Sequence, residues 1–173
     1  MDVKRTLGLP GAAVVFEVIH NPESLVADGF KRKFGSPPPA TDWPHHVCAL
    51  WSPEPGAWRL LGYGHFGRFG DTCLVGGMYT DGRVVRELPA EARQELSRSG
   101  GLAVHLLRFG FAHLGDRFDA FFGLVEDPRA LEVDLAAGFV ETEHDRLVMY
   151  LPKPLDPQHV RCLQAKVLAL GDF

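Results

Sequence analysis

The sequence has few cysteines, little net charge and no long apolar run. Its three cysteines, Cys48, Cys73 and Cys162, are far apart and form no C-x-x-C pair, a pattern that suits neither a disulfide framework nor a zinc site. Lysine and arginine number 18 against 22 aspartates and glutamates, a formal net charge of -4. This balance provides no basic field to draw nucleic acid or a membrane surface, and no segment approaches the roughly 20 apolar residues of a membrane span.

These absences predict a cytoplasmic protein with no metal, no membrane span and no nucleic-acid partner. The first stretch carries Asp2 ahead of its basic residues and Glu17 within its apolar run, which is not the order of a signal peptide. A length of 173 residues with 46% hydrophobic residues suits one domain with a real core. We expect residues 1–155 to form that domain and residues 156–173 to add an amphipathic helix, packed on the same domain or on a partner in a homodimer.

The pattern of apolar and turn-forming residues predicts alternating strands and helices. Short β-rich segments bounded by glycine, proline or aspartate predict strands at residues 12–20, 46–51, 58–67, 73–80, 119–125, 140–143 and 146–150. Helical periodicity and capping residues predict helices at residues 22–34, 90–98, 102–115, 128–137 and from 156 onward. This order fits neither a strictly alternating parallel sheet nor an all-β sandwich, so the fold class is α/β (α+β mixed), with helices on both faces of a mixed sheet.

The glycines before the most apolar helix are the most informative local feature. Arg98, Ser99, Gly100 and Gly101 lead directly into Leu102 and Ala103 at the helix start. Free amides at a helix N-terminus, approached closely because glycine has no side chain, suit a pyrophosphate. The local alternative is a helix cap followed by a turn.

The order of motifs along the chain resembles that of the GCN5-related N-acetyltransferase (GNAT) superfamily. Arg98, Gly101 and Ala103 match its Q/R-x-x-G-x-G/A pyrophosphate loop, residues 127–130 (DPRA) stand where N-P-x-A is common, and residues 138–139 match its Gly-Phe. The resemblance covers about residues 12–152 and implies a GNAT-like, mostly antiparallel central sheet. The sixteen residues between Asp81 and Arg98 make a longer connection than the family usually has.

The resemblance implies acetyl-CoA or another acyl-CoA as cosubstrate, held in a cleft between the strands at 73–80 and 119–125. It implies that Met78, Tyr79 and Thr80 bind the pantetheine arm and that residues 98–103, together with Asp127, bind the rest of the cofactor. Unpaired strand amides can hold an amide-rich arm as an added strand would.

The catalytic residues depart from the family pattern at one position. The tyrosine that commonly protonates the leaving thiolate is replaced by Asp134. A carboxylate is ionised at neutral pH unless it is strongly buried, so Asp134 is predicted to be a poor acid. Candidate bases are Glu126, His65 and Tyr79, and each has a structural alternative: a helix cap, an edge-strand polar residue and a half-buried aromatic, respectively.

Three functions are compatible with these residues. The first is acyl-CoA-dependent N-acyl transfer, with direct transfer of an acetyl group to a small-molecule amine in a ternary complex. The second is transfer of a long acyl chain from acyl carrier protein or acyl-CoA, for which Phe109, Phe111, Phe118, Phe121 and Phe122 offer a pocket. The third is a non-catalytic protein that binds a ligand or partner, which the missing tyrosine favours.

Overall fold

A computed structural model describes residues 4–38, 45–171 and 173. The strands are β1 Lys4–Leu9, β2 Ala12–Val18, β3 His45–Trp51, β4 Arg59–Phe69, β5 Thr72–Thr80, β6 Ala120–Leu124, β7 Val140–Glu141 and β8 Leu147–Tyr150. The helices are α1 Glu23–Phe34, α2 Gly82–Val85, α3 Ala90–Arg98, α4 Leu102–Leu114, α5 Pro128–Ala137 and α6 Pro157–Leu168, with a 3-10 turn at Gly115–Arg117.

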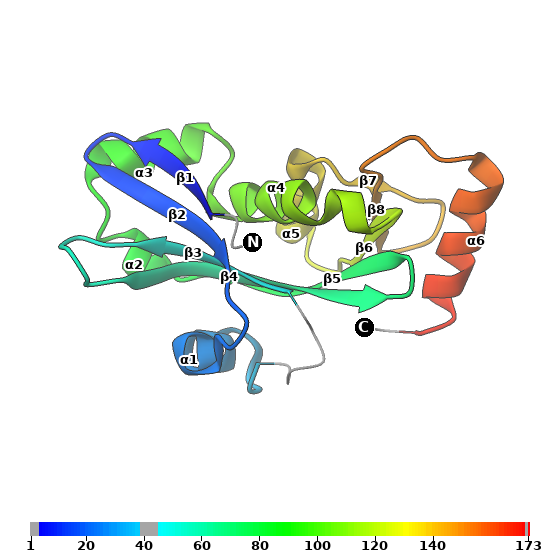
Figure 1. The fold of residues 1–173 in the computed structure, drawn as a ribbon, viewed down its shortest axis with the longest axis horizontal. Coiled ribbons are helices and arrows are strands. Elements are labelled where there is room, and N and C mark those ends of the chain that lie inside the picture. The colour runs from blue at the N-terminus through cyan, green and yellow to red at the C-terminus, as the bar shows by residue number, and fades with distance from the viewer. Residues whose placement is uncertain (1–3, 39–44, 172) are drawn as a thin grey trace.

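Among the described residues, the eight strands form one sheet in the order β1-β2-β3-β4-β5-β6-β8-β7. Neighbouring strands are antiparallel except β5 and β6, which are parallel. A parallel pair needs a crossover connection, and here residues 81–119 supply it through α2, α3 and α4. The predicted mixed, mostly antiparallel sheet with helices on both faces is confirmed (Figure 1).

The two faces of the sheet are covered by different helices. On one face, α4 packs Leu106, Leu107 and Leu114 into the largest apolar cluster, so this helix is the centre of the core. On the other face, α1 lies below β4 and β5 and contributes Val26 and Phe30 to a separate cluster. The same face is covered farther along by α6, whose apolar stripe packs against β5, β6 and β8.

Two elements and the start of one helix differ from the sequence-based prediction. β1 was not predicted because most of its residues are exposed, which leaves little hydrophobic alternation to detect. α2 is a single turn capped by Asp81, whose side chain accepts a hydrogen bond from the Arg83 amide at 3.0 Å. Pro22 occupies the N-cap of α1 and makes no side-chain cap, so the helix begins one residue later than the predicted residue 22.

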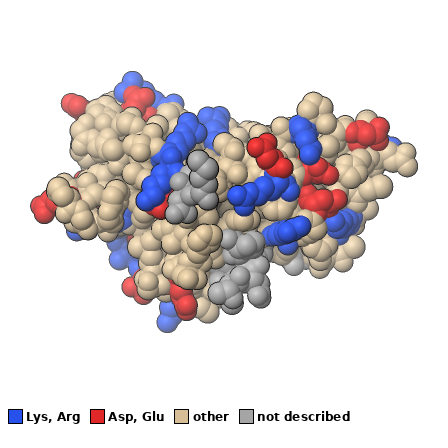
Figure 2. Space-filling view, viewed as in Figure 1, with Lys and Arg blue, Asp and Glu red and all other residues tan. Residues whose placement is uncertain are grey.

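The surface shows no dominant charge on the face seen in Figure 2, where acidic and basic side chains are interspersed. This mixture agrees with the small formal net charge of -4. Within the described ranges, no helix is long and apolar enough to cross a membrane.

Candidate functional site

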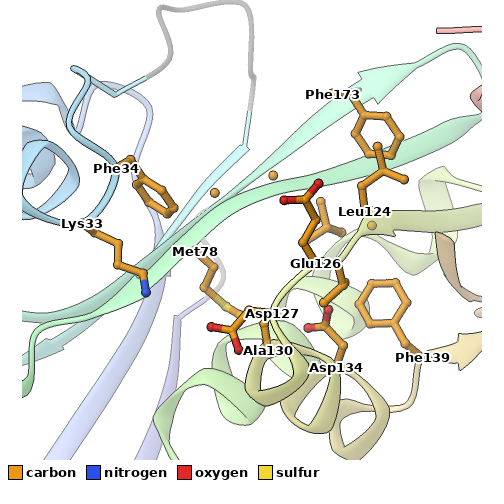
Figure 3. A pocket seen from close by; sticks show the side chains of 15 residues that line it. Lys33, Phe34, Met78, Leu124, Glu126, Asp127, Ala130, Asp134, Phe139 and Phe173 are labelled. Atoms are coloured by element: carbon orange, nitrogen blue, oxygen red, sulfur yellow. The ribbon is translucent and has the colours of Figure 1, made fainter. Parts of the chain in front are cut away.

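A cleft opens where β5 and β6 separate. The two strands pair with each other only over three residues, Thr72–Leu74 of β5 and Ala120–Phe122 of β6. Beyond these residues each strand keeps its other neighbour alone, β4 for β5 and β8 for β6. The space between the diverging strands is a cavity of about 330 Å³, lined by residues of β5, the loop after β6, α5 and the end of α1 (Figure 3). Backbone groups of β5 beyond Leu74 on this side have no strand partner among the described residues, so an extended ligand can pair with them.

A β-bulge in β5 shapes the floor of the cleft. Gly64 pairs with Met78 and Phe66 pairs with Val75, so two residues of β5, Gly76 and Gly77, lie opposite His65 alone. A Cβ atom at Gly76 would lie 2.1 Å from Nε2 of His65, which explains the glycine. Because the bulge adds one residue, it reverses the alternation of faces along the rest of β5.

Charged side chains of opposite sign face each other across the cleft. Figure 3 shows Glu126, Asp127 and Asp134 on the α5 side, and Lys33 with Phe34 on the α1 side. The apolar end is formed by other residues, among them Leu124, Phe139 and Phe173. The five phenylalanines predicted to form an acyl pocket, residues 109, 111, 118, 121 and 122, are instead buried in the core and do not line this cavity.

Asp134 is a buried carboxyl group that faces the cleft. Asp127 caps α5 by accepting a hydrogen bond from the Arg129 amide at 2.8 Å, and Ala130 and Asp134 then line the cavity from successive turns. Asp134 is 9% exposed, and within the described part of the chain its side chain forms no ion pair or hydrogen bond. Burial therefore raises its pKa from 3.8 to about 7.

This pKa corrects the expectation that Asp134 is ionised and a poor acid. A carboxyl group with a pKa of about 7 is protonated in a large fraction of molecules at neutral pH. In that state it can donate a proton to a group bound in the cleft. The expectation of an ionised carboxylate held only if Asp134 was not strongly buried, and the tertiary structure buries it.

A second cavity, also about 330 Å³, lies at the start of α4. Its lining includes Thr80 and Gly82 on one side and residues 100–103 on the other. Gly100 and Gly101 have φ values of +101° and +87°, conformations that L side chains rarely adopt. A Cβ atom at Gly101 would have no neighbour within 4 Å, so the backbone there is open to a ligand.

The structure brings only part of the predicted pyrophosphate loop to this cavity. Residues 100–103 line it, whereas Arg98 is exposed and pairs with Glu95 at 2.9 Å. Ser99 donates to the Leu96 carbonyl at 3.0 Å and its hydroxyl lies 2.9 Å from Nε2 of His105. The Ser99 side chain thus links the end of α3 to α4, whereas the Arg98 side chain pairs within α3.

The two cavities follow each other along the same two elements. Met78 of β5 and Asp134 of α5 line the first cavity, while Thr80 and Val133 line the second. A long ligand can therefore extend from the start of α4 into the cleft. The predicted Met78 and Thr80 both lie along this path.

The side chains of Tyr79 and His65 lie on the face of the sheet that α1 covers, opposite the face that α4 covers. The Tyr79 hydroxyl donates to the Val26 carbonyl at 3.2 Å, and burial raises the pKa of Tyr79 above its usual value. His65 is 4% exposed and its ring centroid lies 6.0 Å from that of Phe30. Burial lowers the pKa of His65 to about 4. Neither side chain lines the cleft.

Glu126 lies at the rim of the cleft with its side chain 76% exposed and paired with Arg146. It does not cap α5, since Asp127 does. Of the three candidate bases, only Glu126 borders the cavity that also contains Asp134. Lys33, Phe34 and the Gly76-Gly77 pair also line the cleft and were not predicted, although paired glycines within a strand are a known sign of a bulge.

In the described ranges, one group of side chains of the types that bind metal ions lies close together, outside the residues that line the cleft. It consists of Asp71, Asp119 and His159. Lys166 binds Asp71 at 2.6 Å and Lys153 binds Asp119 at 2.8 Å. Lysine ammonium groups thus already neutralise both carboxylates.

Comparison with known proteins returns similar structures only. No family model matches the chain, and no curated protein matches it. A GNAT family acetyltransferase from Brucella melitensis in complex with acetyl-CoA is 17% identical, with 79% of this chain and 71% of that chain covered and a TM-score of 0.40. A KacTA–DNA complex is 17% identical, with 70% and 72% covered and a TM-score of 0.40. AtaT complexed with acetyl-methionyl-tRNAfMet is 8% identical, with 87% and 99% covered and a TM-score of 0.42.

These matches correct the predicted partner class. Two of the similar structures contain DNA or tRNA, so the prediction of a small-molecule amine with no nucleic-acid partner is wrong. A likeness of this degree concerns the fold alone, and the chemistry has to come from the site. In its fold the chain is similar to GNAT-family acetyltransferases, as its motifs predicted.

Proposed function

We propose that this protein transfers an acyl group from coenzyme A to an amine, with Asp134 as the proton donor to the leaving thiolate. The observation that carries the proposal is a protonatable carboxyl group, Asp134, buried in the cleft between the separated ends of β5 and β6. The pyrophosphate would lie at residues 100–103 and the pantetheine arm along residues 75–78, which line successive cavities. Helix N-terminal amides and free strand amides suit these two groups.

The proposed chemistry needs three proton transfers. The amine nitrogen attacks the thioester carbon, the carbon–sulfur bond breaks, and the departing sulfur takes the proton of the Asp134 carboxyl group. The nitrogen loses one proton to solvent at the rim, where Glu126 is exposed, and a solvent proton restores Asp134. The products are an amide and a thiol, so the balance of atoms and protons closes. Backbone amides of β5 would polarise the thioester carbonyl.

The test compares Asp134→Asn with Glu132→Gln, a change at an exposed carboxylate of the same helix. We expect both variants to bind coenzyme A in calorimetry as the parent does. Thioester consumption should fall by about 10²–10⁴-fold in Asp134→Asn only, the range of a lost general acid. The parent kcat should fall as pH rises through about 7, where Asp134 ionises.

Three results would contradict the proposal. If Asp134→Asn keeps the parent rate and pH profile, Asp134 is not the acid. If the parent binds coenzyme A but consumes no thioester with any amine-bearing acceptor, the protein is a binding module. Failure to bind coenzyme A would remove the assignment of the cleft.

A further inference from the structure

A pocket of about 230 Å³ with a basic rim lies beside the cleft, between the end of α1, the end of β5 and α2. Four cationic side chains line it: Arg32, Lys33, Arg83 and Arg86. They come from segments that are about fifty residues apart in the sequence. Figure 3 shows Lys33 reaching from α1 toward Met78 in the cleft, and Lys33 lines both cavities.

Most of this positive charge is available to a ligand. Arg32 pairs with Asp81 at 2.7 Å. Lys33, Arg83 and Arg86 are exposed and form no ion pair within the described ranges. The helix dipole is a structural reason for the cations in the last turn of α1, because the C-terminal end of a helix favours positive charge. It is no reason for Arg83 and Arg86, which lie in and directly after the four-residue α2.

The basic pocket and the cavity at the start of α4 meet at Thr80 and Gly82, which line both, and from there they extend to opposite sides of β5. Tyr79 and Gly29, which line the basic pocket, touch each other on the α1 side. Leu102 and Ala103, which line the pyrophosphate cavity, lie at the start of α4 on the opposite side. If coenzyme A occupies the α4 side, the α1 side is left for the acceptor.

An exposed aromatic side chain lies next to these cations. Phe34 is 41% exposed, follows Lys33 directly and lines the cleft. Its ring is held by Phe30, at a centroid distance of 4.5 Å. A fixed aromatic ring beside several cations suits a nucleobase with its phosphates, because the base stacks while the cations bind the backbone.

We propose that this basic pocket binds the phosphate backbone of a single-stranded nucleic acid that carries the acceptor amine. The inference rests on the proposed function, since it places the acyl donor on the α4 side. The local cluster differs in sign from the whole chain, whose net charge is -4, so binding depends on these few side chains and is sensitive to salt.

The experiment measures the binding of a fluorescein-labelled 12-nucleotide RNA by anisotropy. The proteins are the parent, the double variant Arg83→Gln/Arg86→Gln, Phe34→Ala, and the control Arg161→Gln at an exposed position of α6. With three cations on phosphates, parent affinity should fall by about 20-fold between 50 and 200 mM salt. The double variant should bind more weakly, with a salt slope reduced by about 1.4. Phe34→Ala should bind more weakly with an unchanged slope, and the control should match the parent.

Two further measurements test whether the basic pocket binds RNA phosphates or another anion. Calorimetry compares coenzyme A with dephospho-coenzyme A, and the preference between them should be the same in the parent and the double variant. Loss of that preference in the double variant would assign the pocket to the 3′-phosphate of coenzyme A and overturn the proposal. Equal binding of polyglutamate and RNA would also overturn it.

The calorimetry also distinguishes this inference from the proposed function. If the parent binds coenzyme A but not RNA, the inference fails while the assignment of the cleft stands. If the parent binds RNA but not coenzyme A, the assignment of the cleft fails.

Discussion

The burial of Asp134 predicts that replacing this residue stabilises the protein at neutral and alkaline pH. Its pKa rises from 3.8 to about 7 on folding, so between these values the folded chain binds more protons than the unfolded chain. Stability therefore falls as pH rises from about 4, and the loss is complete above about 7. At about 1.36 kcal/mol per pH unit, the ionised carboxylate costs about 4 kcal/mol at pH 8.

Asp134→Asn removes the charge and keeps nearly the same volume. We expect urea unfolding to show the variant more stable than the parent by about 4 kcal/mol at pH 8, and nearly equal to it at pH 4. Other titrating groups, including His65, are common to both proteins and cancel in the difference. Glu132→Gln should show no such pH-dependent gain because Glu132 is exposed. A stability difference that is the same at both pH values would refute the burial argument.

Three other predictions concern the loop before α4, the packing of α1 and the buried histidine. Gly101 has φ +87° and ψ 166°, so Gly101→Val should cost about 1–3 kcal/mol in urea unfolding and turn the loop amides away from the ligand; unchanged coenzyme A affinity in calorimetry would exclude a phosphate there. Gly29→Ala places a methyl group 2.3 Å from the Tyr79 hydroxyl, so stability should fall by about 1–3 kcal/mol, whereas Gly8→Ala, with no atom within 4 Å, serves as the control. Because burial lowers the pKa of His65 from 6.5 to about 4, its contribution to stability is complete above pH 6.5 and falls by about 3 kcal/mol as the pH drops to 4; His65→Gln should lack this loss, and parallel pH curves for the two proteins would contradict it.

Local signals in the sequence were sufficient for most of the secondary structure. Asp156 accepts hydrogen bonds from the first amides of α6, as its position before proline predicts. Asp127 caps α5 in the same way, although the sequence had offered Glu126 as the cap there. Capping and turn formation involve neighbours within a few residues, so the sequence displays them directly. β1 carried no such signal, because its exposed residues do not alternate.

The candidate site depended on contacts between distant segments. Asp134 is an ordinary acid in the sequence, and only its burial beside the cleft raises its pKa. The basic pocket joins α1 to the end of β5 and α2, a juxtaposition that no local pattern encodes. Its positive charge is not visible in a composition that is slightly acidic overall.

Tyr79 illustrates the physical reason most clearly. Simple alternation from Cys73 and Val75 would place Tyr79 on the α4 face, with the largest apolar cluster. The bulge at Gly76-Gly77 inserts one residue, so Met78 packs on that cluster and Tyr79 turns to α1. The sequence by itself determined that residues 73–80 form a strand, whereas the pairing of β4 with β5 decided which side chains face the cleft, because register exists only between two strands.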